Sequence, residues 1–227
     1  TSSAMTALVE QAREAVLTFF NASPETYTVI FTANASGALK LVGEAYPFQS
    51  DSYYLLTFDN HNSVNGIREF ARQCGATTTY VPLDLPEMRV DDARLIDYLA
   101  AAVGDGNRLF TFPAQSNFSG VQHPLDWIPL AQEYGWDVML DAAAFVPTNR
   151  LDLSRYQPDF VPISFYKMFG YPTGIGCLLA RNQALTKLSR PWFAGGTTTL
   201  VSVQNDQYDF RTSGEAFEDS TLNYLGL

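Results

Sequence analysis

The strongest constraint on the fold is a regular alternation of strand-like and helix-like segments along the whole chain. Compact apolar runs rich in β-branched and aromatic residues occur at 27–32, 53–57, 77–81, 108–112, 136–140, 160–164 and 176–180. Segments with apolar residues at helical spacing occur at 3–20, 36–46, 63–74, 91–103 and 124–134. Strands that are separated by helices require crossover connections, so this pattern predicts an α/β fold with a largely parallel sheet.

The pattern loosens after about residue 191. Residues 195–199 are Gly-Gly-Thr-Thr-Thr, which is typical of a loop, and the stretch that follows is polar and acidic. No further closing element is predicted before residue 227. We therefore expect the chain to be part of a longer protein.

Composition excludes several classes of partner. The net charge of −10 argues against nucleic acid, since binding to a phosphate backbone depends on clusters of Lys and Arg. No apolar run approaches the roughly 20 residues that cross a bilayer, so no membrane association is expected. The two cysteines, Cys74 and Cys177, have neither the number of a disulfide framework nor the spacing of metal ligands. These observations favour a reducing, cytoplasmic compartment.

In a doubly wound sheet, ligands bind beyond the carboxyl ends of the strands, so polar residues directly after strands are candidates for a site. Ser36 lies in a turn of small residues before a helix, where it could bind an anion or simply cap the helix. His61 follows the next strand and could stack on an aromatic ligand or be an ordinary loop histidine. Asn117 follows a later strand, where a turn is the simpler interpretation.

Two further positions carry charge. Asp141 ends an apolar strand, where it could meet a cation or cap the following turn, because a buried unpaired carboxylate is costly. Lys167 follows the strand 160–164 and enters an aromatic, glycine-containing segment that we expect to be a loop. An amine needs a lowered pKa to act as a nucleophile, and apolar surroundings supply one.

The order of these five positions is more informative than any one of them. An anion-binding turn, a histidine, an asparagine, a strand-end aspartate and a strand-end lysine fit one aldehyde cofactor bound across one sheet. The aspartate would keep a ring nitrogen protonated, so that the ring accepts electrons from a substrate carbanion. The lysine would bind the aldehyde and then transfer protons. We therefore predict a site for pyridoxal 5′-phosphate.

The chain resembles the class V aminotransferase and cysteine desulfurase group of fold-type I pyridoxal-phosphate enzymes, and within it the cysteine-desulfurase-like domain of molybdenum cofactor sulfurases. The resemblance covers essentially all residues. Its most specific stretches are SFYKMFGYPTG at 164–174, DNHNSV at 59–64 and LDAAA at 140–144, with LKLVGEA at 39–45 and DSTLN at 219–223. It implies the large domain of the aspartate aminotransferase-like fold over residues 1–227, with helices on both faces of the sheet. The N-terminal segment and the small C-terminal domain of the family would lie outside this chain.

The resemblance also implies roles for individual residues. Lys167 would be the catalytic Schiff-base lysine, and Asp141 would pair with the pyridine nitrogen. His61 would stack on the cofactor ring as the second catalytic residue, with Asn117 near the ring hydroxyl. The phosphate contacts would be Ala35, Ser36 and Ser164, and Thr197 would reach the phosphate of a neighbouring subunit in a homodimer.

The sequence departs from ordinary cysteine desulfurases at three points. Ala144 replaces a glutamine that contacts the cofactor, and Tyr166 replaces the histidine before the lysine; both changes resemble the molybdenum cofactor sulfurase branch. Neither Cys74 nor Cys177 matches the family's sulfur-accepting cysteine, which would lie beyond residue 227.

The expected function is transfer of sulfur from L-cysteine, with molybdenum cofactor as a possible acceptor. The alternatives are another class V activity, such as an aminotransferase, epimerase or C–S lyase, and a scaffold domain without cofactor. The substrate contacts that separate these activities lie largely outside this chain.

Overall fold

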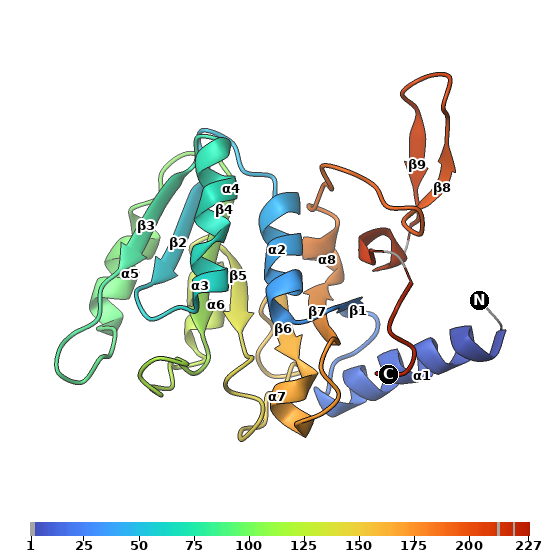
Figure 1. Ribbon diagram of the computed structural model, residues 1–227. Coiled ribbons are helices and arrows are strands. Elements are labelled where there is room, and N and C mark those ends of the chain that lie inside the picture. The colour runs from blue at the N-terminus through green and yellow to red at the C-terminus, as the bar shows by residue number, and fades with distance from the viewer. Residues whose placement is uncertain (1–2, 213, 220) are drawn as a thin grey trace.

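The main element of the fold is a sheet of seven strands. The structure is a computed structural model that describes residues 3–212, 214–219 and 221–227. The sheet has the strand order β1-β7-β6-β5-β4-β2-β3 (Figure 1). Its strands are β1 (Tyr27–Thr32), β2 (Tyr53–Thr57), β3 (Thr77–Val81), β4 (Arg108–Pro113), β5 (Asp137–Asp141), β6 (Phe160–Ser164) and β7 (Gly176–Arg181).

The predicted α/β fold is confirmed, and the sheet is mixed because of one strand. β7 is antiparallel to both of its neighbours, β1 and β6, while the remaining adjacent pairs are parallel. A parallel neighbour requires a long crossover, usually through a full helix. The connection from β6 to β7 contains only the short helix α7 (Phe165–Phe169), so the chain returns antiparallel.

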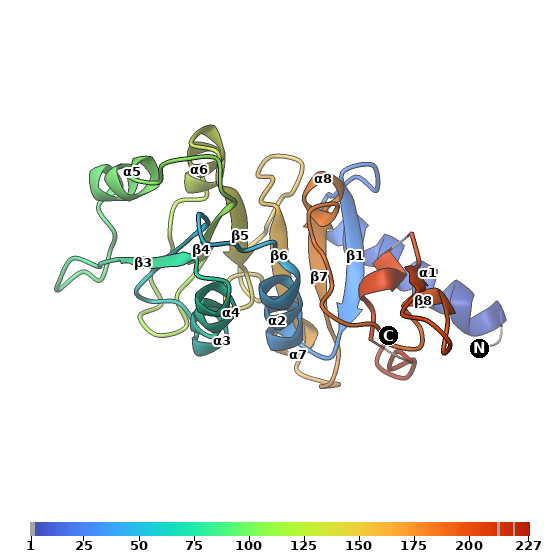
Figure 2. The same ribbon diagram turned by 90° about the horizontal axis from the view of Figure 1, so that it is seen from above.

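Helices cover both faces of the sheet, as expected (Figure 2). One face packs against α2 (Ala35–Ala45), α3 (Asn62–Asn65), α4 (Ile67–Gln73) and α8 (Asn182–Leu185). The other packs against α1 (Ser3–Phe19), α5 (Asp92–Ala100) and α6 (Trp127–Glu133). The strands serve both cores by alternation: Val138 and Leu140 of β5 join one cluster, and Met139 between them joins the other.

Three segments differ from the sequence-based expectation. The helix predicted at 63–74 is divided into α3 and α4 at Gly66, a residue type with low helix propensity. The segment around Lys167 is the helix α7 rather than a loop. The region after 191 contains the exposed antiparallel hairpin β8 (Thr198–Val201) and β9 (Tyr208–Phe210) and the 3-10 helix η1 (Gly214–Phe217). The hairpin is mostly exposed, so its residues lack the apolar pattern of a buried strand.

Within the described residues, the helices are all too short or too polar to span a membrane.

Candidate active site

A pocket of about 240 Å³ lies at the carboxyl ends of the parallel strands. The residues that line it come from the segments that follow β1, β2, β4, β5 and β6, which is where a ligand is expected in a sheet of this type. They are Asn34, Ala35, Ser36, Leu39, His61, Gln115, Asn117, Asp141, Ala143, Ala144, Ser164, Tyr166 and Lys167. Seven of the eight predicted site residues are in this set; Thr197 is not.

A glycine allows the turn after β1 to reach this pocket. β7 lies between β1 and β6 and starts at Gly176, which is paired with Thr32 on one side and Ser164 on the other. A β-carbon at Gly176 would lie 2.5 Å from the carbonyl oxygen of Ile163 and 2.9 Å from the Cα of Asn34. Only a residue without a side chain lets the β1–α2 turn pass so close to the start of β7.

The anion-binding end of the pocket is the start of α2. Asn34 is the N-cap, and its side-chain oxygen accepts a hydrogen bond from the backbone N–H of Gly37 at 2.9 Å. The alternative that Ser36 caps the helix is therefore wrong. Ala35 and Ser36 belong to the first helical turn, where backbone N–H groups have no partner within the helix. These donors and the positive end of the helix dipole favour an anion.

The Ser36 hydroxyl connects this turn to the segment that carries His61. Its Oγ lies 2.7 Å from the Oγ of Ser63. The Nδ1 of His61 accepts a hydrogen bond from the backbone N–H of Ser63 at 3.1 Å, so His61 caps α3 and also lines the pocket. His61 is therefore both a residue that binds the backbone of its own loop and a residue of the pocket, so both interpretations of its position are correct. Its stacking on a ligand stays a prediction.

Asp141 is the most deeply buried charged group of the pocket. It is 7% exposed, and its Oδ1 accepts a hydrogen bond from the backbone N–H of Ala143 at 3.1 Å. Burial raises the pKa of the Asp141 carboxyl, and the Ala143 hydrogen bond and the charges of Lys167 and His61 offset only part of that rise. The carboxylate thus caps a turn and at the same time favours a cation in the pocket.

Lys167 lies on α7, directly after β6, and is partly buried. Ser164, the last residue of β6, is 2% exposed and also lines the pocket. The short helix after β6 places Lys167 in the lining of the pocket, which also includes Asp141 at the end of the neighbouring strand β5. The amine and the carboxylate therefore line one pocket although they are far apart in sequence.

Polar side chains from the segment after β4 also line the pocket. Asn117 is exposed and lines the pocket together with Gln115. Gln115 was not predicted as a site residue; its side-chain oxygen accepts a hydrogen bond from the Gln122 amide at 3.0 Å. Tyr166, noted only as a departure from the family, is 41% exposed and lines the pocket beside Lys167. Gln115 could have been predicted from its position, because it follows the end of β4 by two residues.

Thr197 lies apart from these residues. It is fully buried, and its hydroxyl donates to the carbonyl of Ala194 at 2.9 Å and accepts from the Ala194 N–H at 3.0 Å. The hydroxyl is thus part of a local turn before β8. The predicted contact of Thr197 with the phosphate of a neighbouring subunit stays a prediction.

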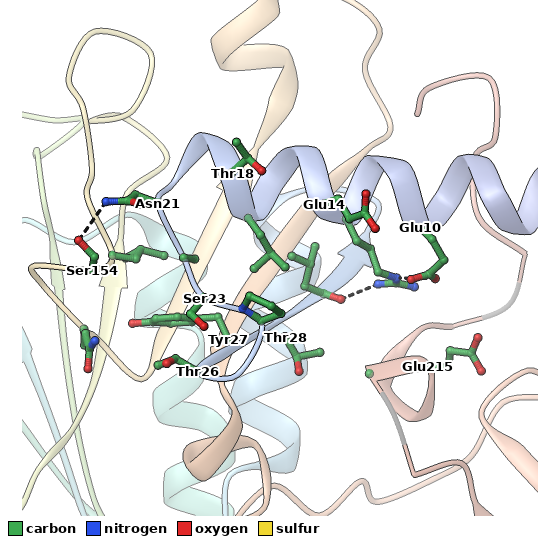
Figure 3. Close-up of a pocket in the computed structure, with 18 residues that line it drawn as sticks. Glu10, Glu14, Thr18, Asn21, Ser23, Thr26, Tyr27, Thr28, Ser154 and Glu215 are labelled. Carbon is green, nitrogen blue, oxygen red and sulfur yellow. Dashed lines mark hydrogen bonds and ion pairs between the residues drawn. The ribbon is translucent and has the colours of Figure 1, made fainter.

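A larger cavity, of about 1120 Å³, lies between α1 and the edge strand β1 (Figure 3). Glu10, Glu14 and Thr28 are among the residues that line it. Its lining contains neither a lysine nor a histidine, and the Arg13 guanidinium is bound by Glu218 at 2.8 Å. This cavity therefore lacks the paired amine and carboxylate that the smaller pocket provides.

The donor set of the smaller pocket fits pyridoxal phosphate better than a metal ion. The buried carboxylate matches a cationic ring nitrogen, the amine matches an aldehyde, and the imidazole matches an aromatic ring; the two serine hydroxyls and the helix N-terminus match a phosphate. In the described part of the chain, no three His, Cys, Asp or Glu side chains lie together as metal ligands.

The comparison with known families agrees with this donor set. The sequence profile of the family described as aminotransferase class-V matches residues 1–227. The chain belongs to the aminotransferase class-V family. This family is dependent on pyridoxal phosphate.

Two curated relatives and one solved structure narrow the similarity within the family. The chain is 43% identical to a molybdenum cofactor sulfurase of Bos taurus over 96% of its own length and 26% of the relative's, and 39% identical to that of Arabidopsis thaliana over 100% and 32%. The fold matches the apo structure of a cysteine desulfurase from Thermococcus onnurineus NA1 with a TM-score of 0.87 and 26% identity, over 99% of this chain and 55% of that one. The chain is thus similar both to a part of molybdenum cofactor sulfurases and to part of a cysteine desulfurase. It spans about a quarter to a third of the length of those curated relatives.

Proposed function

We propose that this chain binds pyridoxal 5′-phosphate in the pocket between α2, β5 and α7, and that the protein takes sulfur from L-cysteine for transfer to an acceptor such as molybdenum cofactor. The observation that carries the proposal is the convergence of Asp141, Lys167 and His61 on one small pocket beside the N-terminus of α2. The similarity to molybdenum cofactor sulfurases supports the choice of sulfur transfer within the family.

The residues of the pocket have separate roles in this proposal. The cofactor supplies, when bound, an electron sink for negative charge that develops on the substrate. Asp141 would hold a proton on the ring nitrogen, since a buried carboxylate gains most from a cationic partner. The backbone N–H groups of the first turn of α2, with the hydroxyls of Ser36 and Ser164, would bind the phosphate.

Lys167 and His61 complete the arrangement. Lys167 would bind the cofactor's aldehyde and, once the substrate has displaced it, hold and return a proton at its Nζ. The imidazole of His61 would cover the ring and exclude water from one side. The proposed overall reaction is balanced: L-cysteine and an acceptor thiol give alanine and the acceptor persulfide. Cys177 is buried in the core and Cys74 does not line the pocket. We therefore assign the role of acceptor thiol to neither cysteine.

The binding proposal is tested by the visible absorption of the full-length protein purified with pyridoxal phosphate. We expect a band at roughly 400–430 nm that Lys167→Ala abolishes. Lys40→Ala is the matched control, because the Lys40 side chain is 70% exposed on α2 and outside the pocket. A band that survives in Lys167→Ala, or no band in the unsubstituted protein, would contradict the proposal.

The reaction is tested separately with the loaded full-length protein, L-cysteine and a thiol acceptor. We expect alanine and persulfide in equal amounts, and neither product with Lys167→Ala. An oxo acid, a D-amino acid or pyruvate as the main product would instead assign the protein to one of the other class V activities. Bound cofactor without turnover of any amino acid would contradict the proposed sulfur transfer.

A further inference from the structure

A buried carboxylate–imidazole pair connects two segments of the chain near the pocket residues His61 and Asn117. The Nε2 of His123 is 2.8 Å from the Oδ2 of Asp59, and the two side chains are 2% and 0% exposed. Neither residue lines the pocket. The pair joins two segments separated by 64 positions in the sequence. Breaking such a pair would leave a polar group unpaired in the interior, which is costly.

The pair ties together the two loops that form one wall of the pocket. Asp59 precedes His61 by two residues in the loop after β2, and its backbone carbonyl accepts a hydrogen bond from the Ser116 hydroxyl at 3.1 Å. Ser116 lies between Gln115 and Asn117, which both line the pocket after β4. His61 and these two residues are therefore held on loops that the Asp59–His123 contact fastens to each other.

Other contacts fix the orientation of both members of the pair. The Oδ1 of Asp59 accepts a hydrogen bond from the Thr57 hydroxyl at 2.9 Å. The ring of His123 stacks on Trp127 with centroids 4.9 Å apart, and the Trp127 Nε1 donates to Asp92 at 2.8 Å. The carboxylate and the imidazole thus each have one fixed position.

The electrostatics of the pair agree with a charged carboxylate. Burial alone would raise the pKa of Asp59, but the hydrogen bond and the charge of His123, with the Thr57 hydrogen bond, outweigh it and lower that pKa. A charged Asp59 holds the His123 ring through a strong hydrogen bond, which restricts the loop more than a neutral contact would.

The His61 ring itself has few contacts of its own that would set its direction. Its only hydrogen bond among those of the described residues is local, to the N–H of Ser63. Its orientation therefore depends on the backbone of the loop. The neighbouring Asn60 reinforces the same attachment, because its side-chain amide donates to the carbonyls of Thr57 at 2.9 Å and Thr111 at 3.2 Å.

We propose that Asp59 and His123 are positioning residues, whose hydrogen bond sets the direction of the His61 ring and its distance from Asn117. This inference rests on the proposed function, since the ring is positioned for the cofactor that Lys167 would bind. The pair does not touch that cofactor. It acts by keeping the wall of the pocket in one arrangement, and we expect loss of this support to weaken cofactor binding by about tenfold, as loss of the groups that orient metal ligands does for metals.

The test uses the full-length protein loaded with pyridoxal phosphate and measures visible circular dichroism and cofactor affinity. His123→Phe keeps a ring against Trp127 but removes the hydrogen bond, and we expect a smaller visible signal and about tenfold weaker binding. His123→Gln places an amide donor within reach of Asp59, so we expect it to restore most of the signal and affinity. If His123→Phe does not fold, the double variant Asp59→Asn/His123→Phe, which has no buried unpaired charge, gives the same comparison.

Tyr46→Phe is the matched control. It removes a buried hydrogen bond of the same length, 2.8 Å, to Asp137 at the start of β5, the end of that strand opposite the pocket. We expect lower stability with an unchanged signal and affinity. If unsubstituted protein shows the cofactor band while His123→Phe or the double variant keeps the original signal and affinity, the positioning role is overturned and the proposed function stands. If unsubstituted protein has no band, the proposed function fails first.

Discussion

The backbone of Asn34 passes so close to Gly176 that a β-carbon on the glycine would lie 2.9 Å from the Asn34 Cα. The same β-carbon would lie 2.5 Å from the carbonyl oxygen of Ile163. Both neighbours are backbone atoms and cannot rotate away. The contact brings the start of α2 across the start of β7, and this places the anion-binding turn beside Ser164, which pairs with Gly176.

Gly176→Ala is therefore expected to lower the free energy of unfolding by about 2–3 kcal/mol, because the backbone of β1 or β6 has to shift. Urea unfolding measures this change. The control is Gly195→Ala, where a β-carbon would meet nothing within 4 Å. We expect that variant to unfold close to the original midpoint, and equal midpoints for both variants would show that the close approach is not needed.

Asn34→Ala is expected to lower the free energy of unfolding by about 1 kcal/mol through loss of the N-cap hydrogen bond to Gly37. Asp91→Ala removes the equivalent bond to Arg94 at the start of α5, away from the pocket. The two variants should be similarly destabilised. Only Asn34→Ala should also weaken binding of pyridoxal phosphate, measured by titration of the visible band; equal affinities would argue against a phosphate site at α2.

Asp141→Asn is expected to stabilise the cofactor-free protein at neutral pH by about 1 kcal/mol and to weaken cofactor binding. Burial raises the pKa of the Asp141 carboxyl, so the folded state binds this proton more tightly than the unfolded state. The stabilising effect of that proton is fully present below the pKa that Asp141 has in the unfolded state. It is lost as the pH rises through the higher pKa that Asp141 has in the folded state.

The increase in the free energy of unfolding caused by Asp141→Asn should accordingly be small in acid and larger at neutral pH. Urea unfolding across the pH range measures it. Asp152→Asn is the control, since hydrogen bonds from Ser154 and Asn21 lower the pKa of that exposed carboxyl. An Asp141→Asn variant that is less stable than the original without cofactor would mean that the buried charge already has a sufficient partner in the chain.

Glu218→Gln is expected to lower the free energy of unfolding by about 3 kcal/mol. Its two carboxylate oxygens accept hydrogen bonds at 2.8 Å from the Arg13 guanidinium, and one also accepts the backbone N–H of Phe31 in the edge strand β1. Glu10 contacts the same arginine at 3.2 Å but is 58% exposed. Glu10→Gln should therefore cost less than about 1 kcal/mol. Similar losses of unfolding free energy for both variants would show that burial of the Arg13–Glu218 pair does not increase its contribution to stability.

The sequence by itself determined the features that depend on local pattern. Alternation of residue types located the seven strands of the main sheet, all of them ending within one residue of the predicted position. Polar residues after strand ends, with the family resemblance, identified seven residues of one pocket, including His61, Asp141 and Lys167. Such signals are readable because strand and helix periodicities are set by residues close together in the chain.

Tertiary structure alone decided what depends on segments distant in sequence. The antiparallel direction of β7, the close approach at Gly176 and the Asp59–His123 pair arise from contacts between elements that no local pattern links. The helical setting of Lys167 and the N-cap at Asn34 were also missed, since a single turn has too few residues to show a period. The physical reason is that hydrogen bonds and packing across the sheet choose among arrangements that local propensity leaves nearly equal in free energy.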